Sequence, residues 1–183
     1  VLIGNVFAES LEAAGKIQQE RGLTFVHPFD DPHIIAGQGT VGLEILNESA
    51  DIDTIVVPIG GGGLASGIST AIKARRPDIE IIGVETKLYP SMLEGMTDQE
   101  FTGGGVTIAE GIAVKQPGGL TLEICKEKLD DVVLVEESSI ERAIQMLIEI
   151  EKSVVEGAGA APLAALLDHP ERFKGKKVCL IIS

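Results

Sequence analysis

Short blocks of apolar residues, rich in valine and isoleucine, alternate along the chain with longer blocks in which apolar residues recur every three or four positions. The short blocks predict strands and the longer blocks predict amphipathic helices. The predicted strands cover residues 1–3, 24–26, 55–57, 79–84, 132–135 and 178–182. The predicted helices cover residues 6–21, 32–46, 64–76, 120–129, 138–148 and 156–168.

This alternation predicts an α/β protein in three layers, with a mostly parallel sheet and helices on both of its faces. In such sheets, ligands bind beyond the carboxyl ends of the strands. Gly60 to Gly63, Glu85 and Ser183 each stand at such an end. We therefore expect these residues to share one crevice.

Four consecutive glycines, Gly60 to Gly63, join the strand over 55–57 to the helix that begins near Leu64. The backbone N–H groups of such a loop, together with the positive end of the helix dipole, form a site for phosphate. A tight strand-to-helix turn seldom needs four glycines, so the pattern favours phosphate binding over a purely structural turn.

The same loop also fits a dinucleotide. Gly60, Gly62 and Ala65 satisfy G-x-G-x-x-A, and Glu85 follows the next apolar block, where an acid can bind a ribose hydroxyl. A dinucleotide-binding domain is therefore an alternative at this point.

The helix after Pro32 contains Gly37, Gly39 and Gly42. Each interior glycine costs roughly 0.5–1 kcal/mol relative to alanine. Three of them indicate either close backbone packing and a site wall, or a helix that starts late.

The 183 residues are 44% hydrophobic and carry a net charge of −13. This charge disfavours nucleic acids and anionic membranes as partners and leaves small molecules favoured. Cys125 and Cys179 have no metal or disulfide spacing, which suits a reducing, cytoplasmic setting. No apolar block approaches the roughly 18 residues that span a bilayer.

Several kinds of catalytic site are disfavoured. His27, His33 and His169 lack ligand spacing and are expected in turns or at the surface. No G-x-S-x-G or G-K-[ST] segment occurs, which argues against acyl hydrolases and P-loop nucleotidases. The acidic pairs at 30–31 and 136–137 are interpreted as decoration of a turn and of a solvated helix start.

Five segments together resemble one family: His27-Pro28-Phe29-Asp30-Asp31-Pro32, the run 35–40, the run 57–64, Ala109-Glu110-Gly111 and Glu156-Gly157-Ala158-Gly159. In this order and spacing they are similar to threonine dehydratases (threonine ammonia-lyases) among the fold-type II pyridoxal-phosphate enzymes. Serine racemase and serine dehydratase are close relatives of that group.

The resemblance implies the fold of the tryptophan synthase β-like enzymes, in incomplete form. Residues 1–24 correspond to a remnant of the small domain, and residues 25–183 to the cofactor-binding large domain without its N-terminal segment. Apolar residues at both ends of the chain also suggest a fragment.

The resemblance further implies pyridoxal 5′-phosphate as the cofactor. The glycine loop and the residue after it hold the phosphate, Ser183 hydrogen-bonds the pyridine nitrogen, and Gly111 lines the ring and the substrate. The implied cofactor-binding residues are Gly60, Gly61, Gly62, Gly63, Leu64, Gly111 and Ser183.

The implied reaction is β-elimination of L-threonine, and of L-serine, to 2-oxobutyrate or pyruvate and ammonia. The intact protein is expected to be a homo-oligomer. The family's Schiff-base lysine lies in a Ser-Phe-Lys-type segment, and none occurs here, so we expect no catalytic residue in these 183 residues and no activity of the fragment alone.

Glu85 matches an acid that ligates a cation in serine racemase, which makes it a candidate metal ligand. Ser91 stands where a second carboxylate is expected, so the alternative for Glu85 is a solvent-facing acid at a strand end. Serine racemase or serine dehydratase activity, and a non-catalytic module that binds a phosphate ligand, are the remaining functional alternatives.

Overall fold

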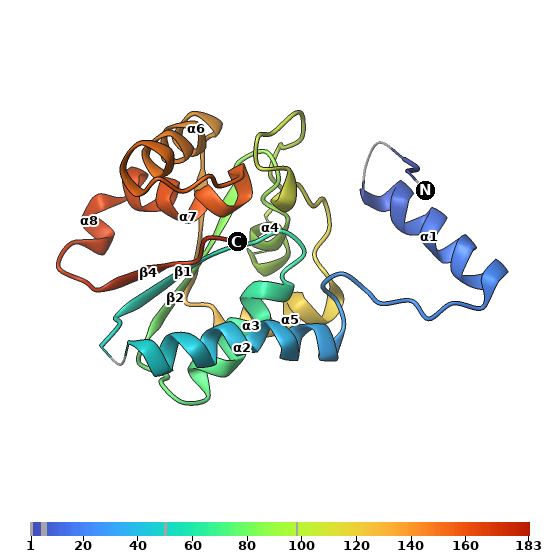
Figure 1. Ribbon diagram of the computed structural model, residues 1–183, viewed down its shortest axis with the longest axis horizontal. Coiled ribbons are helices and arrows are strands. Elements are labelled where there is room, and N and C mark those ends of the chain that lie inside the picture. The colour runs from blue at the N-terminus through green and yellow to red at the C-terminus, as the bar shows by residue number, and fades with distance from the viewer. Residues whose placement is uncertain (1, 5–6, 50, 98) are drawn as a thin grey trace.

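The computed structural model describes residues 2–4, 7–49, 51–97 and 99–183, and Figure 1 shows their arrangement. Four parallel strands form one sheet in the order β3-β2-β1-β4. The strands are β1 (Thr54–Pro58), β2 (Glu80–Thr86), β3 (Asp131–Val135) and β4 (Val178–Leu180).

Helices connect the strands and cover the sheet (Figure 1). The α-helices are α1 (Phe7–Arg21), α2 (Pro32–Glu48), α3 (Gly63–Lys73), α4 (Ser91–Thr97), α5 (Gly119–Lys128), α6 (Glu137–Met146), α7 (Gly157–Asp168) and α8 (Pro170–Phe173). A short 3-10 turn covers Glu110–Ile112, and a π-helical turn over Leu147–Glu151 extends α6.

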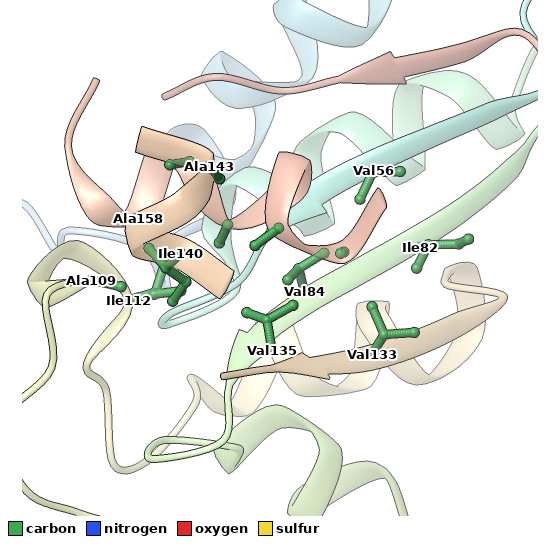
Figure 2. Packing of buried hydrophobic residues seen from close by; sticks show 14 of the residues in the cluster. Val56, Ile82, Val84, Ala109, Ile112, Val133, Val135, Ile140, Ala143 and Ala158 are labelled. Carbon is green, nitrogen blue, oxygen red and sulfur yellow. The ribbon is translucent and has the colours of Figure 1, made fainter. Parts of the chain in front are cut away.

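Successive strand residues point to opposite faces and build two cores. Val56, Ile82 and Val84 pack with α6 and α7, as Figure 2 shows. Ile55 and Ile81 pack on the other face, in a cluster that includes apolar residues of α2, α3 and α5. The predicted fold class, three layers with a parallel sheet between helices, is thus confirmed.

The packing of α2 against α3 explains two of the three glycines in α2. A Cβ on Gly39 would lie 3.2 Å from the Gly67 carbonyl oxygen, and one on Gly42 would lie 3.1 Å from the Ile68 oxygen. The prediction of close backbone packing is therefore confirmed. The alternative of a late start is wrong, because Asp31 caps the helix by accepting the N–H groups of two residues in its first turn.

The order of the strands creates a switch point between β1 and β4. From β1 the chain passes through α3 to β2 and then to β3, and it returns across the sheet through α6 and α7 to β4. The carboxyl ends of β1 and β4 therefore lie side by side, and the Ile181 N–H donates to Val56 O at 3.0 Å. Such switch points are where parallel α/β sheets bind ligands.

The strand predictions at the N-terminus were wrong. Residues 2–3 and 24–26 form no strand, because no described segment pairs with them, and Leu2 and Val26 are exposed. Val1 of the first predicted strand lies outside the described residues, and so does Asn5, whose residue type favours the cap position before the helix predicted from residue 6. Figure 1 shows α1 apart from the sheet and its helices.

The predicted end of α1 is confirmed, since the helix ends at Arg21 and Gly22 adopts the left-handed conformation with φ +61°. Among the helices of the described residues, none has both the length and the apolar character needed to cross a membrane.

Candidate functional site

The glycine loop lies at the switch point, directly after β1. The Ile59 N–H donates to Val84 O at 2.8 Å and keeps the loop on the sheet, and the Ser66 N–H donates to Gly62 O at 2.8 Å to begin α3. Gly61, Gly62 and Gly63 are buried, and Gly60 is half-buried. Gly62 has φ +93°, a conformation that favours glycine.

Among the described residues, the amides of this loop have no protein acceptor. Within the described residues, no backbone or side-chain oxygen accepts the N–H groups of Gly60, Gly61, Gly62, Gly63 or Leu64. Unpaired amides at the N-terminus of a helix, where the dipole is positive, favour an anion such as phosphate. The loop therefore fits the phosphate group that its sequence predicts.

The glycines are also required by close packing inside the protein. A Cβ on Gly61 or Gly63 would lie within 3.0 Å of Phe29, and one on Gly62 would lie 2.8 Å from the Thr121 Cβ. The absence of Cβ atoms in this loop therefore does not serve only to admit a ligand. Neighbouring side chains fill that space at three of the four positions, and the N–H groups alone remain available.

Gly60 and Gly111 lie side by side. A Cβ on Gly60 would lie 3.2 Å from the Gly111 carbonyl oxygen and 3.1 Å from the Ile112 Cα. A Cβ on Gly111 would in turn lie 3.0 Å from the Cβ of Ala158, in the first turn of α7. The segment 109–111 is thus held between the glycine loop and α7, and Gly111 itself is exposed.

Ser183 reaches the same region from β4. Its backbone lies against Gly159 of α7, where an added Cβ would come within 3.2 Å of the Ser183 nitrogen and closer still to its oxygen. Ser183 is exposed. The fold therefore brings together the predicted site residues of the glycine loop, Gly111 and Ser183 around the first turn of α7.

Glu85 is not part of this group. It is fully buried in β2, and its Oε1 and Oε2 accept the N–H groups of Met92 (2.8 Å) and Leu93 (3.0 Å) at the start of α4. The expectation that it shares the crevice is wrong, and so is the solvent-facing alternative. A ribose role is disfavoured because both oxygens are engaged.

Burial raises the pKa of the Glu85 carboxyl to about 8, while the Met92 and Leu93 amides act in the opposite direction. Across the described residues, no group of three or more His, Cys, Asp and Glu side chains is placed to hold a metal ion. The assignment of Glu85 as a metal ligand stays a prediction.

Asp30 is a structural residue that sequence reasoning missed. Its Oδ2 accepts the Gly119 N–H at 3.0 Å and its Oδ1 accepts the Thr121 N–H at 3.1 Å, so it caps α5 from 89 residues away. The interpretation as turn decoration was wrong for both members of the pair, because Asp31 caps α2. A cap donated across such a distance leaves no local spacing in the sequence.

Glu137 was also misinterpreted as part of a solvated helix start. Its Oε1 accepts the hydroxyls of Thr86 (2.7 Å) and Thr107 (2.8 Å), and its Oε2 accepts the Ile108 N–H at 2.8 Å. These bonds join β2 and α6 to the segment that leads into Ala109. Glu137 therefore helps to position the segment 109–111 beside Gly60.

His27 is the turn histidine that its sequence position predicts. Its Nδ1 accepts the Asp30 N–H at 2.8 Å and the Phe29 N–H at 3.3 Å. A cavity of about 870 Å³ adjoins this turn and is lined by Leu11 of α1 and by residues 113–119, but not by the glycine loop or Ser183.

The fold and the loop define a class: parallel three-layer α/β proteins with an anion-binding loop at the switch point. The chain belongs to a family within that class, since residues 1–183 match the family model described as "Pyridoxal-phosphate dependent enzyme". Pyridoxal 5′-phosphate is the cofactor of that family, as the resemblance implied.

The chain is similar to an L-threonine ammonia-lyase of Thermotoga maritima, with 50% identity over 100% of this chain and 46% of the relative. A solved structure of threonine deaminase isoform 2 from Solanum lycopersicum matches with a TM-score of 0.89 and 34% identity, over 100% of this chain and 52% of that chain.

Maize serine racemase matches with a TM-score of 0.88 and 34% identity, over 98% of this chain and 57% of that chain. The chain thus spans about half the length of the proteins it matches. The matches confirm the family and the fold-type II architecture.

Proposed function

We propose that the whole protein is a pyridoxal-phosphate-dependent threonine ammonia-lyase, which converts L-threonine, and L-serine, to 2-oxobutyrate or pyruvate and ammonia. One observation carries the cofactor-binding part of this proposal: five loop amides, from Gly60 to Leu64, have no acceptor among the described residues and stand at the N-terminus of α3. The names of the matching relatives support the choice of reaction, and both matches cover the whole of this chain.

In this proposal the loop amides bind the cofactor phosphate, and thereby fix the distance between the cofactor ring and the residues that react. Gly111 lines the ring, and the exposed Ser183 hydrogen-bonds the pyridine nitrogen. A neutral hydroxyl there leaves that nitrogen without a proton. Bound pyridoxal phosphate supplies the electron sink that makes loss of the α-proton and of the β-hydroxyl feasible.

The segment 109–111 has a second task. It forms one side of the proposed ring site beside Gly60, where Glu137 and the start of α7 hold it. Ala109 of this segment and the adjoining Ile112 are buried in the apolar core that includes Ala158 of α7. A ring bound here is therefore oriented by backbone and small residues, which leaves room for a substrate at the exposed Gly111.

The domain assignment belongs to the same proposal. Residues 1–24 are the remnant of a small domain and residues 25–183 are the cofactor-binding domain, which agrees with the separation of α1 from the sheet (Figure 1). The substrate is a small amino acid and the assembly is a homo-oligomer. The two free thiols, Cys125 and Cys179, favour a cytoplasmic setting.

The test compares the products that the whole protein forms from L-threonine and from L-serine. We expect it to release 2-oxobutyrate from L-threonine in the presence of pyridoxal phosphate, and to lose this activity when the cofactor is removed. The similarity to maize serine racemase makes D-serine formation from L-serine the necessary comparison. Faster formation of D-serine than of 2-oxobutyrate would contradict the proposal and favour a racemase.

A further inference from the structure

The carbonyl group of Gly61 is anchored to the start of α5. The Thr121 hydroxyl donates to the Gly61 oxygen at 2.6 Å, and the Gly118 N–H donates to the same oxygen at 3.3 Å. Thr121 is fully buried. The hydroxyl bond is therefore shielded from water. A hydrogen bond in the protein interior is stronger than one at the surface.

This anchor determines the direction of the next amide. A trans peptide is planar, so its C=O and its N–H point in opposite directions, and the described chain contains no cis peptide bond. Because the Gly61 oxygen points toward Thr121, the Gly62 N–H points away from α5. The Gly62 oxygen accepts from Ser66, so the Gly63 N–H in turn points away from the body of α3.

Asp30 fixes the anchor itself. One carboxylate oxygen accepts the N–H of Gly119, which follows the donor Gly118, and the other accepts the N–H of Thr121, whose own hydroxyl holds Gly61. Asp30 is fixed in turn by its own N–H, which donates to His27 Nδ1 at 2.8 Å. A chain of hydrogen bonds thus leads from the turn before α2, through the start of α5, to the glycine loop.

We propose that Thr121 and Asp30 are positioning residues for the cofactor phosphate, because they determine the direction in which the Gly62 N–H points. Neither residue needs to touch the cofactor. The inference rests on the proposed binding of phosphate by the glycine loop, and it names what pre-organises that loop. A loop whose peptide orientations are already fixed loses less conformational entropy on binding than a flexible loop does.

The test measures phosphate-dependent affinity in the full-length, cofactor-free protein. Pyridoxamine 5′-phosphate and pyridoxamine differ only in the phosphate and form no imine with lysine. The dissociation constant of pyridoxamine divided by that of pyridoxamine 5′-phosphate therefore reports the phosphate contact, and a smaller ratio means a weaker contact. Calorimetric titration gives both constants. We expect Thr121→Val, which keeps the shape and removes the hydroxyl, to reduce this ratio by about tenfold.

Two variants separate positioning from stability. Thr121→Ser keeps the donor and is expected to restore the ratio to the level of the parent protein. Ser69→Ala removes a buried hydroxyl that donates to Ser66 O at 3.2 Å within α3. We expect it to lower the melting temperature and leave the ratio unchanged.

If Thr121→Val does not fold, Asp30→Asn provides the same test, because the variant has an NH2 donor in place of one of the two oxygens with which Asp30 accepts the Gly119 and Thr121 N–H groups. We expect a smaller ratio for it as well. An unchanged ratio in the variant that folds, with a lowered melting temperature, would overturn the inference and leave the proposed phosphate site intact. Equal binding of the two ligands by the parent protein would overturn both.

Discussion

Gly67 of α3 lies so close to Gly39 of α2 that a Cβ on Gly67 would come within 2.6 Å of the Gly39 nitrogen. The two helices therefore touch through their backbones, and α3 is the helix whose N-terminus carries the glycine loop. Because backbone atoms cannot move aside as a side chain can, the contact fixes the position of α3 on the sheet.

We predict that Gly67→Ala destabilises the protein by about 3 kcal/mol, because overpacking must push α2 away from α3. Gly37→Ala is the matched control in the same pair of helices. Nothing lies within 4 Å of a Cβ there, so it should stabilise the protein by roughly 0.5–1 kcal/mol. Urea unfolding measures both, and equal effects of the two substitutions would contradict the packing described.

The backbone of Ser183 depends on Gly159 in the same way. We predict that Gly159→Ala displaces Ser183 and weakens binding of pyridoxamine, which makes only the ring contacts. The dissociation constant of pyridoxamine divided by that of pyridoxamine 5′-phosphate should remain that of the parent protein. Calorimetric titration of both ligands checks this. A loss confined to the phosphate contribution would show that Ser183 has no part in binding the ring.

The pH dependence of stability follows from Glu85. Its pKa is raised by burial from 4.5 to about 8, so the folded state retains a proton that the unfolded state has released. The stabilisation is complete at pH values below about 4.5 and is lost as the pH rises through about 8. From about pH 6 to about pH 9, we expect a loss of roughly 2–3 kcal/mol from this group.

Glu85→Gln provides the comparison, because an amide does not titrate in this range. In EDTA, the stability of the parent protein should fall more steeply with rising pH than that of the variant. Parallel curves would show that the Glu85 carboxyl is ionised in the folded protein throughout this range.

A further prediction concerns the edge of the sheet opposite the glycine loop. Arg172 of α8 forms ion pairs with Asp131 and with Glu80, the latter at 3.2 Å, and its side chain is 29% exposed. We expect Arg172→Met to cost about 1–2 kcal/mol, reduced by the screening that partial exposure allows.

Lys174→Met tests whether any ion pair has this effect. The Lys174–Glu171 pair joins side chains that are 76% and 83% exposed, and its loss should change stability by less than about 0.5 kcal/mol. If the two substitutions cost the same free energy of unfolding, Arg172 does not hold α8 to the sheet.

The layers and most elements of the fold could be predicted from the sequence, because β-branched blocks such as the one in β1 and the regular spacing of apolar residues in α3 are local signals. The strands predicted at 1–3 and 24–26 had similar composition but no partner among the described segments. A strand requires a neighbour, and local composition does not supply one.

The candidate site shows the same division. The four glycines and the helix after them were sufficient to predict an anion-binding loop. The role of Asp30 could not be predicted, because it depends on a contact with Thr121 that only the folded chain creates. Glu85 was placed correctly at the end of a strand, yet its burial under α4 could not be derived from its position.

The most direct test of the central claim is the affinity of the cofactor-free, full-length protein for pyridoxamine 5′-phosphate and for pyridoxamine. If the amides from Gly60 to Leu64 bind the cofactor phosphate, the phosphorylated ligand should bind more tightly by at least about tenfold, or roughly 1.4 kcal/mol. Equal affinities would contradict the assignment of this loop as the phosphate site.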